Sequence, residues 1–144
     1  MTTHKNHSGL TLLRPGKTVF PKSPAKARLE AFKNAYRSRD YRIRFECPEF
    51  TSLCPVTGQP DFGHITIDYV PDGLCLESKS LKLYLFSFRN CNLFHEEAVN
   101  RILDDVIKAI RPRAATVTGD FRPRGGIAIR VEASHPDSQA TITK

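Results

Sequence analysis

Two side chains that could act together as a nucleophile and an acid, Cys54 and Asp61, lie in one Pro- and Gly-rich segment, residues 48–61. Long ordered connections in compact domains tend to be functional. A free thiol is mostly protonated at neutral pH, so a nucleophilic cysteine needs a base or positive surroundings. A carboxylate cannot supply that field, and we interpret Asp61 as a proton shuttle to whatever Cys54 attacks. The alternative is that Cys54 is a small buried hydrophobe.

A second candidate pair, His95 and Glu96, begins a segment with helical periodicity. A carboxylate at a pocket edge can accept two N–H bonds from a guanine-like edge, and a histidine beside it can donate or accept. The alternative is structural: the carboxylate favours the positive helix N-terminus, and the histidine is half buried. The residues alone leave both open.

Cationic side chains occur in two places where a phosphate could bind. Lys79 and Lys82 lie at the start of an apolar segment, where free backbone N–H groups of a helix also face anions. Arg122 and Arg124 lie in the Gly-rich turn 122–126. Polar helix starts are common, so the first pattern is weak by itself.

Several motifs are absent from the sequence. It contains no Gly-x-Gly-x-x-Gly, no Gly-x-x-x-x-Gly-Lys-[Ser/Thr] and no Cys-x-x-Cys. Cys91 and His95 have the i, i+4 spacing of helical metal ligands, but a zinc site needs a third ligand from a distant position. The candidates for that ligand are Cys47, Cys54 and His64. We expect no metal.

Composition describes one small domain with an uneven charge. The chain has 144 residues, 40% hydrophobic, and a net charge of +7. Residues 1–44 hold 11 Lys and Arg against 2 acidic residues, whereas residues 45–144 hold 11 against 13. The basic segment has few aromatic residues and no Trp, which makes direct nucleic-acid binding a weak hypothesis. With no apolar span or secretory signal, we expect a cytoplasmic protein without membrane contact.

The periodicity predicts an α+β fold. Helices are expected over 24–37, over 77–90 with Ser78 as a possible cap, and from about 93 to Pro112. Alternation predicts strands over 41–47, 64–69, 115–121 and 127–133. We predict an antiparallel sheet with two helices on one face, in the order strand, strand, helix, helix, strand, strand. The expected units are an arm (1–22), a catalytic domain (23–133) and a tail (134–144).

Four stretches together resemble the 7-cyano-7-deazaguanine reductases, the nitrile reductases of queuosine biosynthesis, in their short single-module form. Residues 49–62, containing Cys54, resemble that family's nucleophile loop, and residues 77–84, Glu-Ser-Lys-Ser-Leu-Lys-Leu-Tyr, resemble its signature. Residues 94–97 and 123–126 follow at matching places.

The resemblance implies the tunnelling fold, with homo-oligomeric stacked pentameric rings and active sites between subunits. It implies reduction of the nitrile of 7-cyano-7-deazaguanine to an aminomethyl group with two NADPH. Cys54 would form a covalent thioimide and Asp61 would donate the proton. The remaining roles implied are substrate binding by Leu76, Glu77, Ser78, His95 and Glu96, and cofactor binding by Lys79, Lys82 and Arg124.

Two alternatives to this reductase hypothesis stay open on the residues. One is a zinc-dependent hydrolase of the same fold, similar to GTP cyclohydrolase I, which would need a third ligand beside Cys91 and His95. The other is a basic RNA-binding module that works through residues 1–44.

Overall fold

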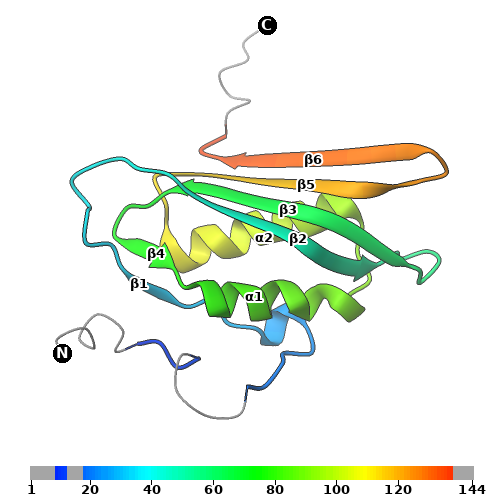
Figure 1. The fold of residues 1–144 in the computed structure, drawn as a ribbon, viewed down its shortest axis with the longest axis horizontal. Helices are drawn as coiled ribbons and strands as arrows, with labels where there is room; N and C mark the ends of the chain where they lie inside the picture. Colours follow the sequence, from blue (N-terminus) through cyan, green and yellow to red (C-terminus); the bar gives the residue numbers. More distant parts are fainter. Residues whose placement is uncertain (1–8, 13–17, 138–144) are drawn as a thin grey trace, which may run out of the picture.

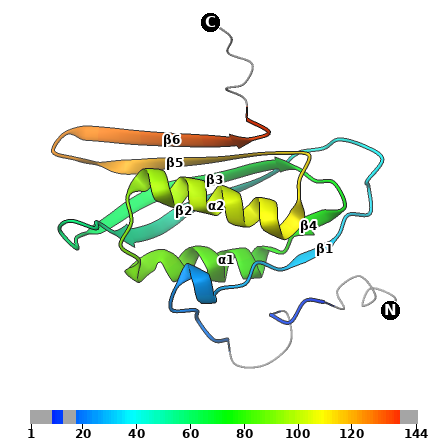
Figure 2. The same cartoon turned by 180° about the vertical axis from the view of Figure 1, so that it is seen from behind.

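The computed structural model describes residues 9–12 and 18–137, and these form a sheet covered on one face by two helices (Figures 1 and 2). The four-stranded sheet has the order β2-β3-β5-β6, and every neighbouring pair is antiparallel. A separate two-stranded sheet pairs β1 with β4. The strands are β1 (Ala31–Lys33), β2 (Ile43–Leu53), β3 (Pro60–Val70), β4 (Leu74–Leu76), β5 (Ala114–Arg124) and β6 (Ile127–His135).

The helix-facing side of the sheet is apolar because the strands alternate. Ile65, Ile67 and Tyr69 of β3 are buried, while the residues between them are half buried on the other face. Helix α2 (His95–Ile110) buries a stripe against this face and ends with Arg111 in the left-handed conformation, just before Pro112. The predicted helix from about residue 93 is confirmed. Its stripe comprises Ala98, Val99, Ile102, Leu103, Val106 and Ile110.

Helix α1 (Ser78–Phe86) lies beside α2 on the same face (Figure 2). Its cap is Glu77, whose carboxylate accepts the backbone N–H groups of Lys79 and Ser80 at 2.7 Å each. The prediction of Ser78 as the cap was therefore wrong, because a carboxylate with two oxygens can satisfy two free donors at once. A 3-10 helix (Ser87–Asn90) completes the predicted helical segment.

The helix predicted over 24–37 is wrong. The chain forms only a short 3-10 helix (Pro24–Lys26), and then β1 pairs with β4. The backbone on either side of this pairing is held by long-range bonds: Glu77 N donates to the carbonyl of Glu30 at 2.9 Å. Strand pairing with a segment more than 40 residues away overrides the local helical spacing.

The long loop predicted over 48–61 is also wrong. Strand β2 continues to Leu53 and β3 begins at Pro60, so the turn spans only residues 54–59. The register shifts between Cys47 and Phe50, and this bulge accommodates Pro48, which cannot donate to a ladder.

Part of the predicted arm contacts the body. Leu10 is buried, the backbone N–H of Thr11 donates to Glu30 at 3.1 Å, and Arg89 donates to the carbonyl of Pro21 at 3.0 Å. Residues 1–8 and 13–17 lie outside the described residues. At the other end, β6 reaches His135, and residues 138–144 of the predicted tail are likewise not described. Within the described residues, none of the helices has the length and hydropathy required to cross a membrane.

Candidate active site

The turn that carries Cys54 is closed on itself and fastened to the segment before α2. Cys54 N donates to the carbonyl of Gln59 at 2.8 Å, and Gly58 N donates to the carbonyl of Cys54 at 2.9 Å. Gly58 has a φ of 72°, a conformation that favours glycine. Leu53 donates to Cys91 at 3.0 Å and accepts from Leu93 at 3.1 Å. The turn and the start of α2 therefore form one unit.

The surroundings of the Cys54 thiol favour its ionised form. Hydrogen bonds lower the pKa of Cys54 to about 7. The side chain of Thr57 makes the largest contribution, and the backbone N–H groups of Thr57 and Val56 add to it. The positive charge of Arg124 acts in the same direction. A substantial fraction of Cys54 is then thiolate at neutral pH, without a histidine base.

Asp61 lies opposite Ser52 on the neighbouring strand, in the same helix-facing layer. Only 7% of its surface is exposed, and its Oδ1 lies 2.8 Å from Nε of Arg124 and 4.0 Å from Nε2 of His95. A second Arg124 nitrogen donates to the carbonyl of Pro60 at 3.0 Å. The carboxylate is thus held by Arg124 at the end of β5, and His95 at the start of α2 lies near it.

The shape of β5 explains why Arg124 reaches Asp61. The register of β5 with β6 shifts between Phe121 and Arg124, and Gly125 and Gly126 both have positive φ. A bulge of this kind bends the strand and redirects a side chain, as is common beside active sites. This places Arg124, a predicted cofactor residue, beside the predicted proton donor Asp61.

His95 is fixed by an aromatic platform. Its ring stacks on Phe121 with centroids 3.8 Å apart and planes at 15°. Nδ1 of His95 and Oγ of Ser52 are buried and have no hydrogen-bond partner. Two unsatisfied polar atoms near one carboxylate leave hydrogen-bonding capacity for a bound molecule. Glu96 is exposed in the first turn of α2, beside His95.

The other predicted substrate residues, Leu76, Glu77 and Ser78, lie elsewhere. They belong to the end of β4 and the start of α1, at the opposite end of the sheet from the Cys54 turn (Figure 1). Leu76 and Glu77 are buried, and the Glu77 carboxylate already caps α1. Within one chain, the structure brings together Cys54, Asp61 and His95, but not these three.

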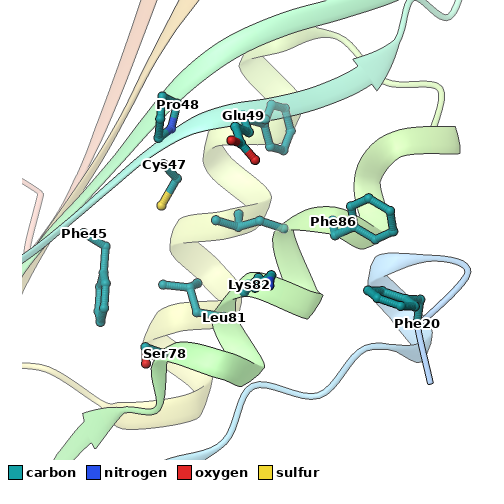
Figure 3. A pocket seen from close by; sticks show the side chains of 11 residues that line it. Phe20, Phe45, Cys47, Pro48, Glu49, Ser78, Leu81, Lys82 and Phe86 are labelled. Carbon is teal, nitrogen blue, oxygen red and sulfur yellow. The ribbon is translucent and has the colours of Figure 1, made fainter. Parts of the chain in front are cut away.

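A cavity of about 550 Å³ lies between β2 and α1, largely apolar with a polar rim (Figure 3). Ser78 and Lys82 reach it from α1 and Glu49 from β2. Phe20 forms one wall and stacks edge-on against Phe86, with centroids 5.2 Å apart. Of the predicted cofactor residues, Lys82 therefore lies at a cavity, whereas Arg124 lies beside Asp61 on β5.

The remaining cysteines differ from Cys54. Burial raises the pKa of Cys47 to about 11 and also raises the pKa of Cys91. All four cysteines are free. Among the described residues, no cluster of three or more His, Cys, Asp or Glu side chains has a geometry that could hold a metal ion.

Three further residues belong to this site, and the sequence reasoning missed them. Thr57 hydrogen-bonds the thiol, Ser52 faces Asp61, and Phe121 supports His95. Only Thr57 had a local signal, because a side chain three residues after the cysteine in a Gly-containing turn folds back toward it. In the sequence, Phe121 and Ser52 have no feature that distinguishes them from other strand residues.

Comparison with known proteins places the chain in a family. Residues 60–140 match the model of the family described as QueF-like protein. A protein of Parabacteroides distasonis is 56% identical over 90% of this chain and 82% of its own length, and is named NADPH-dependent 7-cyano-7-deazaguanine reductase. The chain belongs to the QueF-like family. Proteins with that same reductase name from Bacteroides thetaiotaomicron and Porphyromonas gingivalis are 56% and 58% identical, and this chain covers 79% and 73% of their lengths.

A solved structure supports the same family. The crystal structure of the archaeosine synthase QueF-Like in its apo form matches with a TM-score of 0.58 and 25% identity, over 66% of this chain and 91% of that chain. The predicted α+β class and tunnelling fold are confirmed. β1 and β4 are additions to the strand and helix order that the sequence predicts.

Proposed function

We propose that this chain is an NADPH-dependent nitrile reductase that converts 7-cyano-7-deazaguanine to its aminomethyl form. The observation that carries the proposal is the pairing of a low-pKa thiol on the turn with a buried carboxylate that Arg124 holds and His95 lies near. The names of the relatives in the QueF-like family supply the substrate class. Cys54 and Asp61 are the catalytic residues we assign.

The first half of the reaction is addition of the thiolate. The sulfur of Cys54 forms a bond to the nitrile carbon, one π pair of the C≡N bond moves to nitrogen, and the nitrogen takes a proton from Asp61. The product is a thioimide, whose C=N carbon is a better hydride acceptor than the nitrile. Serine would serve poorly here, because the group that attacks must also leave.

The second half is reduction in two stages. NADPH, when bound, supplies one hydride at each stage. After the first hydride adds to the thioimide carbon, the nitrogen takes a proton from solvent, so the Cys54 sulfur is attached to a saturated carbon that bears an amino group. Its C–S bond then breaks, the sulfur leaves as thiolate, and the resulting protonated imine accepts the second hydride. Cys54 is regenerated, and the aminomethyl product leaves.

Two groups of residues would bind the base, and they lie far apart within one chain. One is at the start of α2 and the other is at the start of α1. Glu96 can accept N–H bonds from the guanine-like edge, and the orphaned Nδ1 of His95 has capacity to bond the substrate. Leu76, Glu77 and Ser78 would act from a neighbouring subunit, with the backbone as donor, since the Glu77 carboxylate is occupied. This division supports a homo-oligomer with sites between subunits, which we propose to be stacked pentameric rings.

The residues proposed to bind NADPH also lie in two separate places within one chain. Lys79 and Lys82 offer ammonium groups at the start of α1, and Lys82 lies on the rim of the apolar cavity. Arg124 lies beside Asp61 on β5, so it would complete the cofactor site from another subunit. These cations would bind the phosphate groups of NADPH and would disfavour a cofactor bound in another position.

The broader setting is also proposed. A reductase of this kind would supply the aminomethyl base for queuosine in tRNA, working as a cytoplasmic enzyme without contacting nucleic acid itself. The two alternative functions have weaker support. The described residues hold no metal-binding cluster for a zinc hydrolase, and the relatives' names point to a reductase rather than an RNA-binding module.

The test is turnover with the nitrile. Purified protein is mixed with 7-cyano-7-deazaguanine and NADPH, and loss of NADPH absorbance is followed together with product mass. We expect two NADPH consumed for each aminomethyl product formed. An inactive wild type, or one that consumes NADPH without forming this amine, would overturn the proposal.

A further inference from the structure

Arg124 contacts Asp61, the proposed proton donor, and the backbone next to it. Its Nε lies 2.8 Å from Asp61 Oδ1, and another of its nitrogens donates to the carbonyl of Pro60, the residue before Asp61. Its charge also acts on Cys54. The side chain is 40% exposed, so it lies between the buried carboxylate and the open side of the site.

The Cys54 thiol and the Asp61 carboxyl lie at the same end of the sheet, and each can carry a negative charge during the reaction. A thiolate at Cys54 and a carboxylate at Asp61 disfavour one another. Thr57 and the turn N–H groups are neutral donors and cannot cancel the charge of Asp61. His95 Nε2 is 4.0 Å from the carboxylate, a longer approach than the guanidinium makes. Arg124 is therefore a permanent cation that acts on both groups.

We propose that Arg124 is a positioning residue for thioimide formation, the half of the reaction that needs no cofactor, where its guanidinium orients Asp61 and balances the charge of the Cys54 thiolate. This inference rests on the proposed reductase function. It adds to the predicted cofactor contact of Arg124 a role that precedes any hydride transfer.

The proton and charge balance of that step explains what the guanidinium does. The proton of the Cys54 thiol passes to Asp61, the sulfur adds to the nitrile carbon, and Asp61 returns the proton to the nitrile nitrogen. The net change is addition of S–H across C≡N, with no external acid, oxidant or reductant. When the proton leaves Asp61, a carboxylate forms 2.8 Å from Arg124, and a fixed cation stabilises that charge as it develops.

The experiment measures thioimide formation without NADPH, so that a cofactor contact contributes nothing. Wild-type, Arg124→Gln, Arg124→Lys and Arg130→Gln proteins are mixed with 7-cyano-7-deazaguanine, quenched at intervals and weighed by intact mass spectrometry. Arg130 is the matched control, an exposed arginine on β6 that pairs with Asp120 at 3.6 Å. Thermal melts establish that each variant is folded.

We expect Arg124→Gln to slow adduct formation roughly 100- to 1,000-fold, the range for loss of one preorganised charge-stabilising donor. Arg124→Lys should fall between it and the wild type, because it keeps the charge but loses the planar fork. Added guanidinium at millimolar concentration should restore part of the rate in Arg124→Gln, which a purely structural role would not allow. Arg130→Gln should match the wild type.

Adduct formation at the wild-type rate in both Arg124 variants, with only NADPH-dependent turnover impaired, would overturn the inference and leave Arg124 as a cofactor contact. If Arg124→Gln does not fold, the rate of Arg124→Lys decides the question by the same comparison. A wild type that forms no adduct would instead overturn the proposed function and this inference with it.

Discussion

Two cysteines, one on strand β2 and one in the turn that follows it, show how local surroundings set the pKa of a thiol. Cys47 lies within β2 and lines the cavity between β2 and α1, and burial raises its pKa to about 11. Cys54 lies seven residues further along, in the turn, where Thr57 and backbone N–H groups lower its pKa to about 7. The pKa of the same side chain is therefore raised in one place and lowered in the other.

Burial sets the pKa of Cys47, whereas hydrogen bonding sets the pKa of Cys54. A turn leaves backbone N–H groups unpaired, and these converge on the residue at its start. A strand uses its N–H groups for the ladder and has none to give a side chain. The reactive end of the hairpin also collects Asp61, Arg124 and His95, whereas the Cys47 end collects apolar walls.

The sharpest way to break this comparison is to remove each thiol in turn. Cys54→Ala should lower the rate of nitrile reduction at least about 10³-fold, because the covalent route is lost. Cys47→Ala should stay within about threefold of the wild type, since its thiol takes no part. Steady-state NADPH consumption with the nitrile measures both. Comparable losses in the two variants would contradict the contrast.

The role of Asp61 in the reactive region gives the next largest effect. Asp61→Asn keeps the shape but cannot donate the proton in the same way, and kcat should fall about 10²- to 10⁴-fold. Asp120→Asn is the control, because Asp120 is an exposed aspartate of the same sheet paired with Arg130. An unchanged kcat in Asp61→Asn would remove Asp61 from the chemistry.

The platform under His95 can be tested through stability. A methyl group at Gly119 would approach Phe121 at 2.6 Å and Val99 at 2.8 Å, so Gly119→Ala should lower the free energy of unfolding by about 1–3 kcal/mol. Gly73→Ala meets nothing closer than Arg37 at 3.8 Å and should change it by less than about 0.5 kcal/mol. Denaturant unfolding measures both, and equal stability of the two variants would show that Phe121 has room to move.

The smallest effect concerns the thiolate itself. The rate of Cys54 alkylation by iodoacetamide should rise with pH through a midpoint near pH 7, because a lowered pKa places thiolate above that pH and thiol below it. Thr57→Val removes the donor that contributes most, so the midpoint should move upward and the rate at neutral pH should fall severalfold. A midpoint that stays where it was in Thr57→Val would assign the shift to the backbone alone.

Periodicity predicted the parts of the fold that depend on local pattern. The stripe of α2 and the alternation in β3 are read directly from the spacing of their apolar residues, and both are confirmed. The segment 24–37 was predicted wrongly because its structure depends on pairing with Leu74–Leu76, which no local pattern reveals. The turn was predicted too long because the bulge after Cys47 lets a proline remain within a strand.

The candidate site divides in the same way. Cys54, Asp61 and His95 were named from residue type and motif, and the structure brings them to one end of the sheet. The ion pair between Arg124 and Asp61 was not predicted, because it depends on how the bulge in β5 aims the side chain. The distance between these two side chains depends on strand register, and the pattern of residue types along the sequence does not predict that register.

The most direct test of the account is the identity of the residue that captures the nitrile. Protein is incubated with 7-cyano-7-deazaguanine in the absence of NADPH, digested, and mapped by tandem mass spectrometry. The account predicts an increase equal to one substrate mass on the peptide that contains Cys54, absent in Cys54→Ala and released when NADPH is added. An adduct on Cys47, or none on any cysteine in a protein that still reduces the nitrile, would contradict it.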